Sequence, residues 1–327
     1  MKKKVLRITI LLSFITNFLT AQIDEAYQLY LKAATEQKQA KKIQLFKEFL
    51  SKYSGQGTPY EKYVYANLAL MPGTSKDYSR AIEYGEKALS FSDLDEFTKT
   101  QLYIVLSGSY TELGQNLEKA KRYADLAIEL AQVNVNRDST ATTPKQWQRL
   151  LGGGYYAKAS TLRKLNQDVQ AVDYLIKAYN ILKNQQIARD LKKVAKTCYN
   201  LKRYKEAENA CSIAYSVLKD YESTYYYAKA LYRNGKKEQA LIYFKRAYNK
   251  YRHSDIAYNI GIILAKDETR LDEAINYLAE ATVLNNGNIS GQAKKLLEHL
   301  YFNKKKGTKE EFEKLLKDAK TRLGLIS

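Results

Sequence analysis

The sequence predicts an all-α fold made of repeated pairs of antiparallel helices, and three observations lead to it. Alanines seven residues apart lie on nearly the same face of a helix, where a small side chain lets a neighbouring helix approach closely. Such pairs recur, the last four at steps of 36, 33 and 34 residues, and a period of 33 to 34 is that of a helix–turn–helix repeat. Turn signals such as Asn234-Gly235 precede the pairs. The pairs are Ala81/Ala88, Ala120/Ala127, Ala171/Ala178, Ala207/Ala214, Ala240/Ala247 and Ala274/Ala281.

A second pattern marks the helix before each alanine pair. The segment YIVLSGSY, residues 103–110, has the spacing aromatic-x2-Leu-small-x2-Tyr, and Gly114 then ends the helix. Phe244 and Leu278 each stand four residues after the first alanine of a pair. Together these residues resemble the tetratricopeptide repeat (TPR), whose pattern is W-x2-L-G-x2-Y followed by A-x3-F and a proline.

The resemblance is strongest from Tyr103 to Asn285 and has two departures. The opening tryptophan is replaced by Tyr103 or by small residues, and the closing proline is missing from every unit. The resemblance implies a right-handed α-solenoid of about eight antiparallel helix pairs, in which each unit packs on its neighbours.

The first residues have the order of a secretory signal peptide. A basic start, MKKKVLR, precedes an apolar run over residues 8–19, and Ala21 offers a small residue for cleavage. We therefore expect cleavage after Ala21 and export to the periplasm or cell surface of a bacterium. The alternative is an uncleaved membrane anchor, which is disfavoured because a spanning helix needs about 20 apolar residues.

The rest of the chain divides by its turns and loops. We expect a signal peptide over 1–21, TPR-like helix pairs over 22–132, a polar loop over 133–143, central repeats over 144–288 and capping helices over 289–327. Thr143-Pro144 restarts a helix after the loop, and Thr58/Glu61 and Thr308/Glu311 read as capping boxes. The three glycines at 152–154 are either a close approach of the preceding helix or a joint between two helices, and the sequence leaves both alternatives open.

The net charge of the chain indicates which classes of partner it could bind. The formal net charge is +19, and removal of the four basic residues of the leader leaves +15, which favours an acidic protein or an anionic envelope polymer or lipid as the partner. Export argues against nucleic acid. The alternative is that the lysines only solvate the outer faces of the helices.

Catalytic chemistry is not indicated. The two histidines, His253 and His299, stand alone, and the motifs of metalloproteases, nucleotide-binding loops and serine hydrolases are missing, so we expect no enzymatic activity, metal or cofactor. Cys198 and Cys211 are expected on the two helices of one unit. Their axial offset favours buried free thiols over a disulfide, which needs Cα atoms within about 7 Å.

TPR proteins bind ligands on the surface lined by their first helices, and the resemblance implies the same surface here. Rings and cations on one face suit an extended acidic peptide or an anionic polymer. Asn is missing beside the cations, so the carboxylate-clamp subtype is not indicated. Two functions follow: an exported scaffold that binds a protein or peptide, or a protein that binds envelope polyanions or membrane surfaces through its charge. The implied residues are Tyr156, Arg163, Lys164, Lys192, Lys196, Tyr199, Tyr225, Lys229, Tyr232, Arg233, Tyr258 and Lys266.

Overall fold

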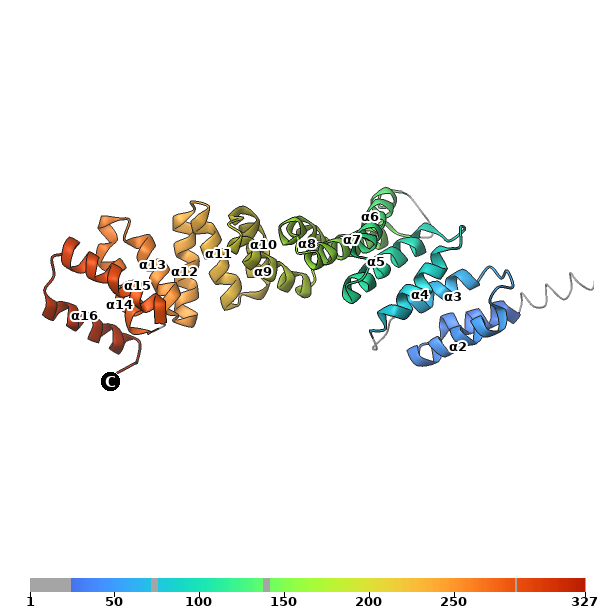
Figure 1. Ribbon diagram of the computed structural model, residues 1–327, viewed down its shortest axis with the longest axis horizontal. Coiled ribbons are helices and arrows are strands. Elements are labelled where there is room, and N and C mark those ends of the chain that lie inside the picture. The colour runs from blue at the N-terminus through green and yellow to red at the C-terminus, as the bar shows by residue number, and fades with distance from the viewer. Residues whose placement is uncertain (1–24, 72–75, 138–141, 286, 327) are drawn as a thin grey trace, which may run out of the picture. The chain divides into compact units, whose positions relative to one another are not determined.

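A computed structural model describes residues 25–71, 76–137, 142–285 and 287–326, and every regular element in these ranges is a helix (Figure 1). The expected signal peptide and its cleavage site lie outside the described residues. No helix in the described ranges has both the length and the apolar character needed to cross a bilayer. The chain forms two compact units. The first ends at Gln167 and also includes Asn180–Leu182, and the second contains Asp168–Tyr179 and the residues from Lys183 onward.

The first unit consists of paired helices. A helix over residues 25–35 is followed by helices α2 to α7, and α3 packs on α4, α5 on α6 and α6 on α7. The polar loop was expected from residue 133, but α6 continues through Asn134, whose side-chain amide donates to Glu96 and to the Leu130 carbonyl. The helices are α2 (Gln39–Tyr53), α3 (Glu61–Leu70), α4 (Tyr78–Leu89), α5 (Glu96–Leu113), α6 (Leu117–Asn134) and α7 (Pro144–Lys164).

The second unit continues the same pattern. Here α9 packs on α10, α11 on α12 and α13 on α14, and the last helices pack against α14. The prediction of an all-α fold built from helix pairs is confirmed. The elements are α8 (Asp168–Leu182), α9 (Gln185–Asn200), α10 (Tyr204–Leu218), α11 (Tyr221–Arg233), α12 (Lys237–Tyr251), α13 (Ser254–Leu264), η1 (Glu268–Arg270), α14 (Leu271–Val283), α15 (Gly287–Glu298), η2 (His299–Lys304) and α16 (Lys309–Arg322).

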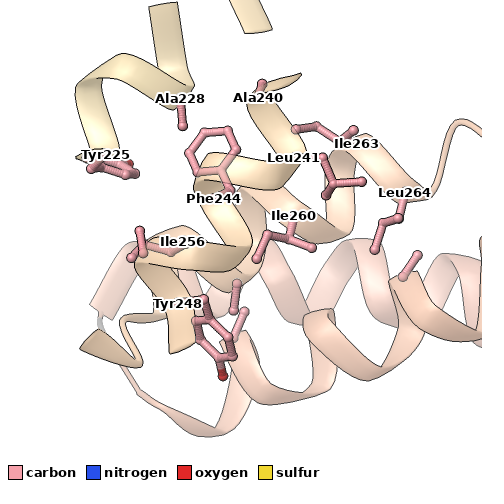
Figure 2. Close-up of a cluster of buried hydrophobic side chains, with 14 of the residues drawn as sticks. Tyr225, Ala228, Ala240, Leu241, Phe244, Tyr248, Ile256, Ile260, Ile263 and Leu264 are labelled. Carbon is pink, nitrogen blue, oxygen red and sulfur yellow. The ribbon is translucent and has the colours of Figure 1, made fainter. Parts of the chain in front are cut away.

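The alanine pairs lie in the helix crossings, as the spacing predicts. Every alanine of the six pairs is buried. On α12, Phe244 lies between Ala240 and Ala247 in the sequence. Its fully buried ring lies near Ala228 of α11, in a hydrophobic cluster that also holds Ile256 and Ile260 of α13 (Figure 2). Burial of such a ring contributes about 1.5–3 kcal/mol to folding. The small alanine side chains therefore let the helices approach closely enough for the Phe244 ring to be buried between them.

The three glycines of α7 lie inside one uninterrupted helix, so the alternative of a joint is wrong. A Cβ on Gly154 would come within 3.1 Å of Ile128 Cγ1 and 3.3 Å of its backbone nitrogen on α6. A Cβ on Gly152 would lie 2.8 Å from Leu182 Cγ. The close contacts on these two sides offset the cost of glycine in a helix, which is about 1 kcal/mol each.

Two of the predicted helix starts are confirmed and one is wrong. Capping boxes form at the N-terminus of α16, with Thr308 and Glu311, and at the N-terminus of α7, with Thr143 and Gln146. The predicted box at Thr58 does not form, because the Glu61 carboxylate turns back to the end of α2. It accepts hydrogen bonds from the Ser54 hydroxyl at 2.7 Å and the Gly55 amide at 3.0 Å, and α3 begins only at Glu61.

Candidate partner-binding surface

The predicted site residues lie on the first helices of successive pairs and fall into two groups. One group is on α7, in the first unit, and the other is on α9, α11 and α13, or directly after α13, in the second unit. On α11 the residues are four, three and one apart, which places them on one side of that helix. The α7 group is Tyr156, Arg163 and Lys164, and the second group is Lys192, Lys196, Tyr199, Tyr225, Lys229, Tyr232, Arg233, Tyr258 and Lys266.

A pocket of about 370 Å³, here called the α11 pocket, is lined by residues of α9, α11, α13 and α15. Six predicted residues line it: Tyr199, Tyr225, Lys229, Tyr232, Arg233 and Tyr258. Four further lining residues were missed by the sequence analysis: Asp255, Asn259, Ile262 and Ile289.

Part of what was missed had a signal in the sequence. Asp255, Asn259 and Ile262 are three or four residues from one another or from Tyr258, so they share its face of α13. Ile289 had no such signal, because it belongs to α15, which the sequence predicts only as a capping helix.

Lys229 occupies the centre of a cage of tyrosine rings. Its Nζ lies 4.7 Å from the ring centroid of Tyr199, 4.9 Å from that of Tyr225 and 5.4 Å from that of Tyr226. With the residues that the structure describes, its ammonium group makes no hydrogen bond and no ion pair. Burial lowers the pKa of Lys229, against the attraction of the Asp255 carboxylate on α13. We call Lys229 and these three rings the lysine cage.

The other cations near the α11 pocket bond to phenol oxygens. Arg233 Nε donates to the Tyr199 hydroxyl at 3.4 Å, and Lys266 Nζ donates to the Tyr232 hydroxyl at 2.7 Å. Neither forms an ion pair within the described part of the chain. Their positive charge is therefore not neutralised by a contacting carboxylate.

The carboxylate of Asp255 is already engaged. It accepts hydrogen bonds from the Tyr221 hydroxyl at 3.1 and 3.3 Å. Asn259 Nδ2, one turn further along α13, donates to the Tyr225 hydroxyl at 3.5 Å. These bonds tie α13 to the tyrosines of α11.

The two lysines of α9 differ from Lys229, because each of them forms ion pairs with carboxylates. Lys192 Nζ lies 2.7 Å from Asp220 and 3.4 Å from Glu222, and Lys196 Nζ lies 3.0 Å from Glu222. Burial alone would lower the pKa of Lys192, but the hydrogen bond and charge of Asp220 outweigh it and raise the pKa. The hydrogen bond that Lys196 donates to Glu222 likewise raises the pKa of Lys196. Carboxylates at the start of α11 thus neutralise this part of the surface.

The α7 group does not line the α11 pocket. Tyr156 and Arg163 are half-buried on α7, and Lys164 is exposed. These three residues belong to the first unit, whereas the other nine predicted residues belong to the second.

Both cysteines are buried and free, as the sequence analysis favoured. Burial raises the pKa of Cys198 to about 12 and raises that of Cys211 as well. Thiols with raised pKa values hold little of the reactive thiolate at neutral pH, so they act as small apolar side chains. In the described ranges, no cluster of three or more His, Cys, Asp or Glu side chains is placed to hold a metal ion.

The chain is similar to several solved structures, although the sequence identities are low. No family model and no curated protein matches the sequence. YrrB, described as a TPR protein with an unusual peptide-binding site, is 21% identical over 67% of this chain and 98% of its own, with a TM-score of 0.44. A tetratricopeptide repeat protein from Parabacteroides merdae is 15% identical over 85% of this chain and 98% of its own, with a TM-score of 0.41. The apo form of RapI is 16% identical over 81% and 100%, with a TM-score of 0.41.

Proposed function

We propose that this protein is a non-catalytic helical-repeat scaffold that binds a protein or peptide partner along α9, α11 and α13. The observation that carries the proposal is the α11 pocket, where adjacent repeats present tyrosine rings together with Lys229 and Arg233. Neither cation contacts a carboxylate of the residues that the structure describes. Pockets of a few hundred Å³ with few convergent polar groups are typical of binding sites. Rings combined with cations suit a partner segment that carries both apolar and acidic groups.

The competing function is binding of an envelope polyanion or a membrane surface through overall charge. The net charge of +19 favours it. The ion pairs of Lys192 and Lys196 count against it on this surface, because they place Asp220 and Glu222 beside the cations. Charge-led binding falls steeply as salt rises, whereas packing of rings in a pocket survives better.

A matched pair of variants tests the proposal. The surface variant carries Lys229→Ala, Arg233→Ala and Lys266→Ala, and the control carries three Lys→Ala changes on the second helices, at Lys205, Lys237 and Lys250. Each variant loses three positive charges. Partners recovered from an envelope extract on the unaltered chain should be lost with the surface variant and kept with the control. Equal loss with both variants would mean that diffuse charge binds the partner.

We also propose that the protein is exported. The support is the sequence order of basic start, apolar run and small residue at Ala21. Mass spectrometry of the exported protein should give a chain that begins at Gln22. A chain that keeps residues 1–21 in the membrane fraction would favour the anchor instead.

A further inference from the structure

Lys229 has a counterpart one repeat earlier, and the comparison shows what it lacks. Lys196 and Glu222 are 26 residues apart and form an ion pair at 3.0 Å. Thirty-three residues later along the chain, the same two positions hold Lys229 and Asp255, which form no ion pair. The acid is one methylene shorter in this second pair, and its oxygens accept hydrogen bonds from Tyr221.

The N-cap residue of the next first helix also differs between the two repeats. Asp220 is the N-cap of α11 and contacts Lys192, but the equivalent N-cap of α13 is His253. Lys192 itself is replaced by Tyr225 at the equivalent position of α11. Two lysines and two acids in the first repeat thus correspond to one lysine and one acid, Asp255, in the second, where rings surround the lysine.

A half-buried ammonium group without a contacting anion is unfavourable for folding. Burial disfavours the charged form, as the lowered pKa of Lys229 shows. The faces of Tyr199, Tyr225 and Tyr226 compensate in part, since cation–π contacts stabilise a cation without accepting its N–H bonds. Its hydrogen-bond donors therefore lack acceptors within the described part of the chain.

We infer that Lys229 is the specificity-determining residue of the proposed binding surface and that it pairs with one carboxylate of the partner; the inference rests on the proposed function. Arg233, on the same side of α11, lies beside it as a second donor. Tyr232, Tyr258 and Ile262 line the same pocket and contact the apolar part of the segment that carries the carboxylate. Asp255 lines the same pocket and repels anions, and because this repulsion grows with the charge of the ligand, a single carboxylate fits better than a polyanion.

The carboxylate has two sources, an internal Asp or Glu side chain and the C-terminus of the partner. Two random peptide libraries, one with free and one with blocked C-termini, are selected on the full-length chain. The best peptides are then synthesised in the acid form and with the acid replaced by its amide. An acidic side chain is the source if the blocked library yields binders that need Asp or Glu. The terminus is the source if binders come from the free library and are lost on amidation.

The expected result is a weakening of about tenfold or more when the peptide acid becomes an amide. Lys229→Met should weaken the acid peptide by a similar factor and leave the amide peptide unaffected, because both changes remove the same contact. Lys196→Met, which removes a lysine already paired with Glu222, is the matched control and should leave the affinity within about twofold. The change in the peptide needs no protein variant, so the test stands even if Lys229→Met folds poorly.

The contrary outcomes separate the inference from the proposed function. Peptides that bind equally well as acids and amides, but are lost with Tyr232→Ala, overturn the role of Lys229 and leave the peptide-binding surface in place. A chain that enriches no peptide from either library overturns both. Binding of polyphosphate that Lys229→Met and Lys196→Met weaken equally, with no peptide enriched, assigns the surface to polyanions instead.

Discussion

The lysines of α9 and the lysine of α11 are one repeat apart, yet their surroundings are opposite. Lys196 is exposed and paired with Glu222, whereas Lys229 is half-buried among rings and forms no ion pair with any residue that the structure describes. The pKa is raised by the Glu222 hydrogen bond in the first case and lowered by burial in the second. Residue type and helix face were the same, so the neighbouring helix decides whether a surface lysine is free to bind a partner.

The largest expected effect tests whether both regions rest on the same scaffold. Ala207 lies in α10 and Ala240 in α12, and both are fully buried. Ala207→Leu and Ala240→Leu should each lower the free energy of unfolding by about 1–3 kcal/mol, because a larger side chain must enter a closed helix crossing. Thermal melts equal to that of the unaltered chain would show that these alanines are not at tight crossings.

Lengthening the acid at position 255 by one methylene should give Lys229 the same kind of ion pair that Lys196 has. Asp255→Glu restores the Lys–Glu pair of the preceding repeat, so Lys229 gains an internal partner and the affinity for an acidic peptide should fall about tenfold. Asp255→Asn removes the charge without reaching Lys229 and should not weaken binding. Calorimetric titration of the selected peptide measures both. Identical affinities for the two variants would contradict the argument from side-chain length.

Stability should respond in opposite directions to the loss of each lysine. Lys229→Met removes an ammonium group that forms no ion pair and adds an apolar side chain among the rings. The free energy of unfolding should therefore stay the same or rise. Lys192→Met leaves Asp220 and Glu222 with less positive charge and should lower the free energy of unfolding by up to about 1 kcal/mol. Urea melts of the two variants compare them directly. A lower stability for Lys229→Met than for Lys192→Met would reverse the comparison.

The smallest expected effect is on the acid side of the pH range. The hydrogen bond from Lys196 lowers the pKa of Glu222 below its ordinary value of 4.5. A carboxylate with a lowered pKa in the folded state adds stability above that ordinary value and loses it as the pH falls through the folded pKa. Glu222→Gln should therefore melt slightly below the unaltered chain at pH 7, with the difference vanishing as the pH falls through the lowered pKa that Glu222 has in the folded state. A difference that persists in acid would show that charge is not its cause.

The sequence predicted what depends on short-range periodicity. Alanine spacing located the crossings, and Thr308 and Thr143 located two helix starts, because these signals lie within one helix or its first turn. The same reasoning found the face of α11 that lines the pocket.

The pairing of charges between helices was not predicted. Lys196 and Glu222 are 26 residues apart and meet only when α9 and α11 come together. Tyr226 was missed because it is next to Tyr225 along the chain, although its ring completes the lysine cage. The Thr58 start failed for a related reason, since Glu61 found a partner in the preceding turn rather than in its own helix.

The pKa of the Lys229 ammonium group tests the central claim most directly. Nuclear magnetic resonance of the lysine side chains, assigned with Lys229→Met and Lys196→Met, would follow both groups through an alkaline titration. The account predicts a pKa below the ordinary 10.5 for Lys229 and above it for Lys196. A Lys229 pKa at or above that of Lys196 would mean that an anion of the chain already neutralises Lys229, and the claim that it awaits a carboxylate from the partner would be wrong.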